Sequence, residues 1–551
     1  MRLTSSFPPA LSRRRFLTTS AQLSAYALAG VGLGARTLSA TEVGRHNAQA
    51  FLEDPPIPER LRQLAAQALD AARSAGAQFA DIRIGHTQIL GVGIYDGVTP
   101  DIVLESTLSY GVRAMVRGAV AFEYGTLLSP DAVARTARNA VAQAKGFAAL
   151  INDTELVSAP VVQGEWHSPM TIDPFTVPIL EQADLLGAYS AAVDGRVEGA
   201  GGFGAFTWER ETRVCATTDG TCTTQTFVRA LPYFNMFARW FGMVGLKLPE
   251  FGPRLSGYEY VTQPGIQERI KAYGDTAMRY ARLRSKALDI GRYPVVFDGE
   301  STATLLNSTV GPALQLDRAL GFEADTSGGS FLTPPMDMLG TAIFSPSVSI
   351  ATSRPASDIS GAKWDDEGVA PSPTPMPLVA DGRLVDYFTD RRTALALRDW
   401  YAKRHTPLVS RGYSVARTAD SPVLVGTGHL TMDPASSRTS LEDLTRQLKR
   451  GLLLIQASYV ATDQQLASGF FYGTLMLEVN HGQITNRIKN VALQFKTTTL
   501  WKGVEAIGDS TTLGTGDVSL AKGQPWQRIP STSRAPAMSC KAIDVIQVPG
   551  Q

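Results

Sequence analysis

The first apolar pattern after the N-terminal segment has helical spacing. It covers residues 59–69, and its apolar positions fall on one face of a helix: Leu61, Leu64, Ala65, Ala68 and Leu69. A second helix should begin after Ser129, because Ser is a favoured N-cap residue and Pro130 suits the first helical position. This helix is expected to end near Lys145.

Between and beyond these helices, the pattern changes to the period of two that is typical of strands. Residues 79–84 and 89–95 predict two strands, and residues 109–117 predict another. Residues 197–261 are rich in strand pattern, residues 267–288 predict a helix, and residues 294–297 form a short apolar strand that Asp298 separates from a following helix. Residues 355–377 are loop-like, and strands return at 473–479 and 484–491.

These elements predict an α+β protein in two large parts. At 551 residues the chain is too long for one ordinary core. We expect an N-terminal mixed helix and sheet domain over 41–195, a middle β-rich and helical region over 196–290, and a mostly antiparallel β-rich domain over 291–551.

The charge balance argues against nucleic acid as the main ligand. Lys and Arg total 52 and Asp and Glu total 51, which gives a formal net charge of +1. Three cysteines are too few for a disulfide scaffold. Cys215 and Cys222 flank a predicted turn over 218–221, where a two-residue hairpin would place Cys222 opposite Thr217. A disulfide and simple burial both remain open for this pair.

The N-terminus has the order of residues found in export signals. Paired arginines at Arg13 and Arg14 precede an apolar, small-residue stretch that ends near Ala40. Residues 1–40 are therefore predicted to be a cleavable twin-arginine signal peptide, which implies a periplasmic or extracellular protein. No later segment approaches the roughly 20 apolar residues of a membrane span.

Several short segments occur in the order in which they occur in one known family. Residues 76–83 (GAQFADIR) resemble its opening strand, and residues 111–118 resemble its Gly-x-Arg-x strand and turn. Residues 363–368 (KWDDEG) resemble its Asp-Asp-Glu-Gly loop. Further matches are 298–300, 382–384, 390–394, 468–470 and 480–484. On these segments the chain resembles the TldD/PmbA (TldD/TldE) family of metallopeptidase-like proteins.

The resemblance implies a zinc motif, His-Glu-x-x-x-His, on the helix after residue 298. Two histidines and a distant Cys would hold zinc, and the Glu would serve as general base. In this chain Asn307 stands at the first His, Ser308 at the Glu and Pro312 at the second His. The segment that matches the family's Cys-Gly-Lys, residues 519–524, contains no Cys, and Cys540 lies well beyond it. We therefore expect no metal cofactor and no catalytic residue at these positions, and Pro312 should bend the helix.

Other charged residues are candidates for lining the family's peptide cavity. Asp365, Asp366 and Glu367 have the oxygen ligands that a hard cation prefers, although a solvated turn is the favoured interpretation. Asp317 and Arg318 follow the altered motif and are the other cavity candidates. His405 and His429 fall in segments that flank the cleft and are expected to be surface histidines.

Three functions follow from the resemblance. In the first, this chain is the metal-free partner of a TldD-like zinc-bearing subunit, or pairs with itself, and shapes a cavity for unfolded peptide. The second is an active exported metallopeptidase with displaced ligands such as His405, His429 or residues 365–367. The third is a stand-alone peptide-binding protein.

Overall fold

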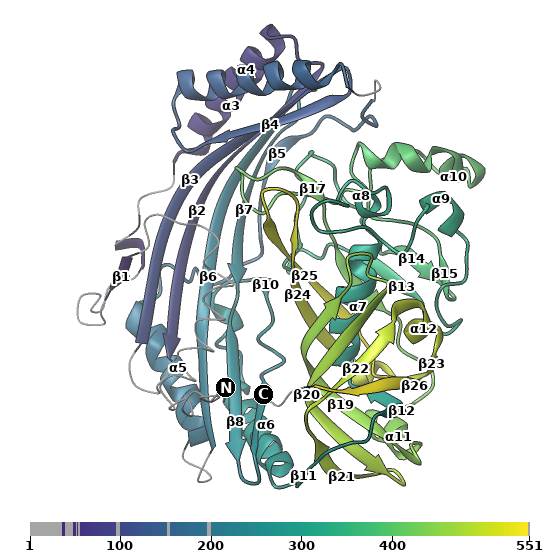
Figure 1. The fold of residues 1–551 in the computed structure, drawn as a ribbon. Helices are drawn as coiled ribbons and strands as arrows, with labels where there is room; N and C mark the ends of the chain where they lie inside the picture. The colour runs from purple at the N-terminus through teal and green to yellow at the C-terminus, as the bar shows by residue number, and fades with distance from the viewer. Residues whose placement is uncertain are drawn as a thin grey trace, which may run out of the picture.

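The computed structural model describes residues 36–38, 48–50, 52, 56–94, 100–150, 155–194 and 200–548. It confirms an α+β fold in two large parts, which lie side by side in Figure 1. The paired arginines of the predicted signal peptide lie outside the described residues. Of residues 1–40, only Arg36–Leu38 are described, as the short strand β1 beside β3 (Pro100–Val116).

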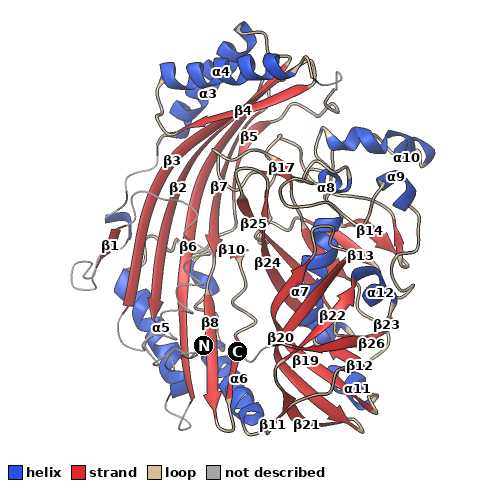
Figure 2. Ribbon diagram, in the orientation of Figure 1, coloured by secondary structure: helices blue, strands red, loops and turns tan. Residues whose placement is uncertain are grey.

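A ten-stranded sheet forms the first part, and Figure 2 shows its long, curved strands. Its centre is β2 (Phe79–Ile94), which pairs antiparallel with β3 on one side and with β6 (Ala200–Thr217) on the other. The two strands predicted over 79–95 are thus one, because residues 85–88 are paired on both sides. The other strands are β4 (Ala119–Gly125), β5 (Gln163–His167), β7 (Cys222–Ala230), β8 (Tyr233–Arg239), β9 (Met243–Lys247) and β10 (Arg254–Leu255).

Helices cover both ends of this sheet (Figure 1). At one end lie α3 (Pro58–Ser74), which buries the predicted apolar face, and α4 (Pro130–Phe147). The predicted cap of α4 is confirmed, since Ser129 accepts a hydrogen bond from the Ala132 N–H. At the other end lie α5 (Ile179–Asp194) and α6 (Ile266–Ala281). Helix α6 ends before residue 288, because the chain then extends beside β21 (Gln483–Ile488), where Arg487 N donates to Arg284 O.

The sheet crosses the point at which the sequence analysis divides the first two domains. Strands β2 and β3 precede residue 195, whereas β6 follows it, and β2 pairs with β6 over fourteen residues from Asp81 to Ile94. Residues on both sides of 195 therefore share one sheet. Short 3-10 helices connect its strands and the later elements: Ala48–Ala50, Tyr258–Tyr260, Thr393–Leu397 and Ser510–Thr512.

The second part contains an eight-stranded and a six-stranded sheet around α7 (Gly299–Ala313). Most of their pairings are antiparallel, but β12–β19, β11–β21 and β18–β25 are parallel. The eight-stranded sheet also includes β11 (Ser285–Lys286), β12 (Gly291–Phe297), β19 (Arg450–Thr462), β20 (Ser468–Asn480), β22 (Val491–Lys496), β23 (Val504–Ile507) and β26 (Met538–Gln547). The six-stranded sheet consists of β13 (Ile350–Ser353), β14 (Met376–Ala380), β15 (Arg383–Leu384), β18 (His429–Met432), β24 (Gly514–Lys522) and β25 (Gln527–Ala535).

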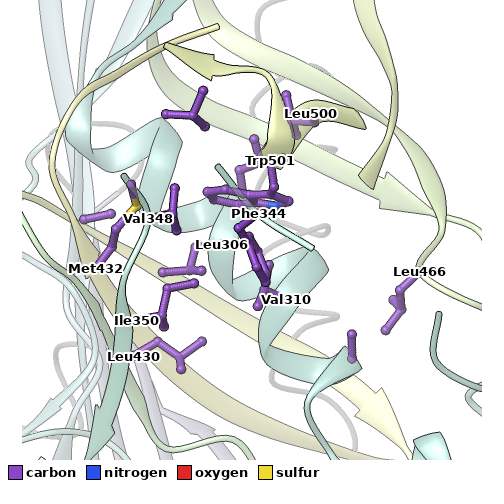
Figure 3. Close-up of a cluster of buried hydrophobic side chains, with 14 of the residues drawn as sticks. Leu306, Val310, Phe344, Val348, Ile350, Leu430, Met432, Leu466, Leu500 and Trp501 are labelled. Carbon is purple, nitrogen blue, oxygen red and sulfur yellow. The ribbon is translucent and has the colours of Figure 1, made fainter. Parts of the chain in front are cut away.

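Helix α7 lies in the core of this part. Its Leu306 and Val310 belong to the apolar cluster in Figure 3, with Phe344 and Trp501 packed edge to face at 5.9 Å. The Trp501 indole N–H donates to Thr309 Oγ1 at 3.2 Å. Shorter elements connect the sheets: α8 (Leu316–Ala319), α9 (Pro335–Met338), α10 (Arg398–Lys403), α11 (Leu441–Arg446), α12 (Thr497–Lys502), β16 (Ser414–Val415) and β17 (Leu424–Val425).

Two details of the sequence prediction differ from the structure. The strand expected over 484–491 is interrupted before Val491 by a turn in which Asn490 has a φ of 59°. The hairpin after β6 has a longer loop than predicted, so Cys222 pairs with Ala216 instead of Thr217. Cys215 and Cys222 are both free thiols, as is Cys540. Within the described ranges, no helix is long and apolar enough to cross a membrane.

Candidate functional site

The central strands of the ten-stranded sheet are buried on both faces, and the two faces differ in chemistry. One face carries Ile82, Val112 and Val214, which pack against α3 and α4. The other carries charged residues in alternate positions: Asp81, Arg83, Glu209, Glu211 and Arg213, all at most 5% exposed. Because buried charges are costly unless they are paired, this second face needs partners from the other half of the molecule.

The loop at residues 365–368 supplies those partners. Arg213 Nη1 lies 2.8 Å from Asp366 Oδ1, and Arg113 Nη2 lies 2.8 Å from Glu367 Oε1. Arg113 also binds Asp81 at 2.5 Å, so three of the family-like segments meet in one ionic network. Burial opposes ionisation of Asp366, but Arg213 and Arg83 lower the pKa of that carboxyl overall.

The same loop is therefore not the solvated turn that the sequence favours. Asp365 and Glu367 are each 2% exposed, and Asp366 is 7% exposed. Asp365 accepts hydrogen bonds from Glu367 N and Val369 N through one oxygen and from Ser414 N through the other. Burial and the neighbouring Glu367 raise the pKa of Asp365 to about 7. The loop is thus an internal ionic joint between the two halves.

A close backbone approach accompanies this joint. Gly111 in β3 lies where an added Cβ would be only 2.6 Å from Ala419 O and 2.5 Å from the Phe122 ring. Gly85 in β2 would meet Ala419 Cβ at 2.9 Å. Two glycines thus let residues near 419 lie directly on the sheet.

A cavity of about 70 Å³, open to solvent, lies between the two halves, beside the ionic joint. Strands β6 and β7 form one wall, and residues 354–366, 413–417 and the β24–β25 hairpin form the other. Figure 1 shows this hairpin reaching toward β7. The cavity wall contains four arginines and several apolar side chains: Arg213, Arg229, Arg354, Arg417, Phe227, Ile359, Trp364 and Tyr413.

A smaller hollow of about 20 Å³ adjoins this cavity, and Thr427 and Ile529 line both spaces. Its wall includes Pro312 and Gln315 at the end of α7, Arg318, Ser531 and Lys522. The main cavity therefore adjoins the helix at which the sequence places the altered motif.

The side chains at the altered positions on α7 are buried or make contacts within the protein. Asn307 donates from Nδ2 to Ser531 O at 2.9 Å and accepts from Ser531 Oγ at 3.0 Å, which ties the helix to β25. Ser308 is 6% exposed. Pro312 lies one residue before the end of α7, so its missing N–H affects only the last turn.

Next to these positions, a buried ammonium occupies the side of the smaller hollow. Lys522 Nζ contacts both carboxylate oxygens of Asp317 at 2.8 and 2.7 Å. It also donates to Gln315 Oε1 at 2.9 Å and to Val425 O at 2.7 Å. Burial lowers the pKa of Lys522, whereas Asp317 acts in the opposite direction.

The cavity candidates from the sequence fall into two groups. Asp365 and Asp366 line the main cavity, and Arg318 lines the smaller hollow. Asp317 and Glu367 line neither, and are held by Lys522 and Arg113. The remaining acidic neighbour, Glu323, accepts from Gly523 N at 3.1 Å.

The histidine candidates do not form a ligand set. His405 is exposed after α10, whereas His429 is partly buried and its Nδ1 lies 3.0 Å from Asp358 Oδ2. Within the described part of the chain, no three His, Cys, Asp or Glu side chains are grouped as a metal site would require.

Comparisons with known proteins show which family the chain resembles. Residues 290–547 match the family model for the PmbA/TldA metallopeptidase C-terminal domain. A protein from Methanothermobacter thermautotrophicus named Metalloprotease is 21% identical over 465 residues, which cover 82% of this chain and 94% of the relative. Residues 290–547 belong to the TldD/PmbA family.

Solved structures extend the match across both halves. TldE from Thermococcus kodakarensis superposes with a TM-score of 0.64 at 14% identity, covering 88% of this chain and 99% of TldE. A Thermotoga maritima protein, named as a candidate modulator of a DNA gyrase, gives a TM-score of 0.66 at 13% identity and covers 88% of this chain and 100% of its own. At these identities the likeness establishes the fold of the chain and not its activity.

The side chains at the motif positions do not fit a zinc ion. Asn307 has an amide already bound to Ser531, and Pro312 has no side-chain donor. The nearby Lys522 ammonium would repel a second cation. The residue types at 307, 308 and 312 could be read from the sequence, but the Lys522–Asp317 pair could not, because its members are 205 residues apart.

Proposed function

We propose that this TldD/PmbA member is a metal-free, noncatalytic subunit that binds unfolded peptide and works with a zinc-bearing member of its family. The observation that carries this proposal is the set of side chains at the end of α7. Asn307, Ser308 and Pro312 replace two ligands and the base, and Lys522 places a cation beside them. Here the chain itself would supply no hydrolytic step.

The cavity supports the second half of the proposal. It lies between two parts of the chain that buried ion pairs hold together, so its walls have a fixed spacing. It combines guanidinium groups with apolar surface, a mixture that suits the polar backbone and varied side chains of a peptide. The likeness of the fold to TldE is consistent with a role in a two-subunit assembly.

A separate part of the proposal concerns where the protein is located in the cell. Residues 1–40 would direct export by the twin-arginine route, which carries proteins that are already folded. A zinc-bearing partner could then be exported with this chain. Cell fractionation of the natural chain and of a variant with Arg13→Lys and Arg14→Lys tests this directly, and release of both into the same compartment would contradict it.

The test of the whole proposal uses the purified mature chain alone and with a zinc-bearing family member from the same genome. We expect no stoichiometric zinc and no cleavage by the chain alone, co-purification with the partner, and cleavage by the pair. Close to one zinc per chain with chelator-sensitive cleavage would instead establish an active metallopeptidase. Peptide binding by a chain that does not associate with any such partner would indicate a stand-alone binding protein.

A matched pair of variants connects the result to the cavity. Val415 lines it, whereas Val409 is exposed elsewhere. Val415→Trp should reduce peptide binding and cleavage by the pair, because the larger ring fills the cavity. Val409→Trp should leave both unchanged, and equal effects of the two variants would argue against the cavity as the peptide site.

A further inference from the structure

The four arginines of the main cavity are not equivalent. Arg213 is paired with Asp366 at 2.8 Å, Arg229 with Glu209 at 2.6 Å, and Arg417 also with Glu209. Glu211 pairs with both Arg213 and Arg229, so three carboxylates neutralise these three guanidinium groups within the protein.

Arg354 is the exception. It follows β13, lines the cavity and is partly exposed. Its Nε donates to Ser360 O and its Nη1 to Gly412 O, both at 2.8 Å. Among the described residues, no carboxylate lies within 4.0 Å of Arg354, and its Nη2 donates no hydrogen bond. The two carbonyls fix the orientation of the guanidinium group but do not cancel its charge.

Asp365 lines the same cavity but does not serve as the missing partner. Both of its oxygens already accept hydrogen bonds from backbone N–H groups of residues 367, 369 and 414. It is 2% exposed, and burial together with Glu367 raises its pKa to about 7, although the charge of Arg354 acts to lower that pKa. Arg354 therefore keeps an Nη2 group that donates to no acceptor in the described part of the chain and is available to an anion in the cavity.

The side chains around Arg354 limit the kind of anion that the cavity can bind. Phe227, Ile359 and Trp364 line the same space and give it apolar walls. A ligand that fills it would carry a planar anionic group next to an apolar one. A carboxylate matches the planar, two-donor geometry of a guanidinium group, and peptides present carboxylates beside apolar side chains.

We propose that Arg354 binds a carboxylate of the peptide, with the adjoining apolar side chain against Trp364 and Phe227. This assignment rests on the proposed function, because it names the chemical class of peptide that the cavity takes. The carboxylate is either the C-terminus of the peptide or an acidic side chain, and the test separates these two sources.

The probe is an uncharged hexapeptide that ends in phenylalanine and carries an N-terminal fluorescent label. It is made as the free acid, as the C-terminal amide, and as an amide with Glu in the fifth position. Binding to the mature chain is measured by fluorescence anisotropy. We expect at least one carboxylate peptide to bind about 10-fold or more tightly than the plain amide, as for other charge-assisted hydrogen bonds. Preference for the free acid identifies the C-terminus, and preference for the Glu peptide identifies a side chain.

Variants assign the preference to one guanidinium group. Arg354→Met should abolish the difference between acid and amide, and Arg354→Lys should retain part of it, because an ammonium keeps the charge without the planar fork. The matched control is Arg404→Met, since Arg404 stacks on Trp400 on the exposed α10 and does not line the cavity. This control should keep the full preference.

The outcomes separate the two proposals. Equal binding of all three peptides by the natural chain would overturn the role of Arg354 while leaving peptide binding intact. A folded Arg354→Met chain that still prefers a carboxylate would overturn it as well. Absence of binding by any peptide would overturn both the carboxylate site and the peptide-binding function. The comparison of acid and amide on the natural chain needs no variant, so a misfolded Arg354→Met protein would not decide the result.

Discussion

The Lys522–Asp317 pair is the sharpest test of how the altered motif region is held together. Both side chains are at least nine-tenths buried, and the ammonium contacts four acceptors. Lys522→Met keeps a similar length but removes the charge. Asp317 then remains as a buried carboxylate that still accepts two backbone hydrogen bonds, one from the Val425 N–H at 3.2 Å and one from the Arg318 N–H.

The expected loss follows from what remains after the change. Removing one member of a buried ion pair costs about 3–5 kcal/mol, mostly because the other charge is left without a counterion. Asp317→Asn alone should cost a similar amount, because it leaves the ammonium among neutral acceptors. The double variant removes both charges and should recover much of the loss, so the coupling energy should be about 2 kcal/mol or more.

Urea unfolding, monitored by the fluorescence of Trp501 and the other tryptophans, measures these differences. With a slope of about 3 kcal/mol per M, a loss of about 4 kcal/mol lowers the midpoint by about 1.3 M. A Lys522→Met protein within about 1 kcal/mol of the natural chain, or additive effects in the double variant, would refute the reasoning. Either result would mean that water or a rearrangement reaches this site and screens the charge.

Three further predictions concern the joint between the halves. The raised pKa of Asp365 stabilises the folded chain at low pH, and this contribution, of order a few kcal/mol, is lost as pH rises from about 4 through 7. Asp365→Asn should therefore flatten the pH dependence of stability, which urea titrations at several pH values will detect. Glu209 behaves in the opposite way, because the effect of burial on its pKa is outweighed by Arg417 and Arg229, which lower that pKa to about 2. Its contribution to stability, roughly 3 kcal/mol, should be lost as pH falls from about 4.5 to 2. Glu209→Gln should remove that acid-dependent loss while lowering stability at neutral pH. Gly111→Ala should cost about 1–3 kcal/mol of stability, measured by thermal unfolding, because the added Cβ meets Ala419 O. In the control Gly146→Ala, the added Cβ in α4 meets no atom within 4 Å, so this variant should be neutral or slightly stabilising. Equal shifts in the two variants would contradict the close approach at Gly111.

Local patterns predicted the elements that depend on nearby residues. The apolar face of α3, the Ser129 cap of α4 and the Asp298 cap of α7 all follow from side chains within one or two turns. The end of α6 and the length of β2 were predicted less well. Both depend on partner strands far along the chain, which override local preference.

The burial of residues 365–367 shows why part of the site could not be predicted. A run of three acidic residues in a Pro-rich segment is normally solvated, and the nearest cation in sequence, Lys363, lies over the Trp364 ring. Its partner Arg213 lies 153 residues before Asp366. The alternation in β2 gave a partial signal, since Asp81 and Arg83 fall on one face of the strand and Ile82 and Ile84 on the other. Only the assembled fold shows that this polar face is covered.

The ionic joint and the cavity depend on the same residues, which has a consequence for function. Arg213 lines the cavity and also binds Asp366, so the residue that fixes the spacing of the walls is part of the wall itself. Buried ion pairs contribute little net stability but discriminate strongly against other arrangements, because a shifted interface would leave charges unpaired. The joint therefore acts mainly on geometry: it holds the ten-stranded sheet and the loop at residues 365–368 at one separation. A chain with no zinc ligands at the motif positions still needs such a fixed cavity if it binds peptide, whereas a chain without that role would gain by replacing these charges with apolar residues.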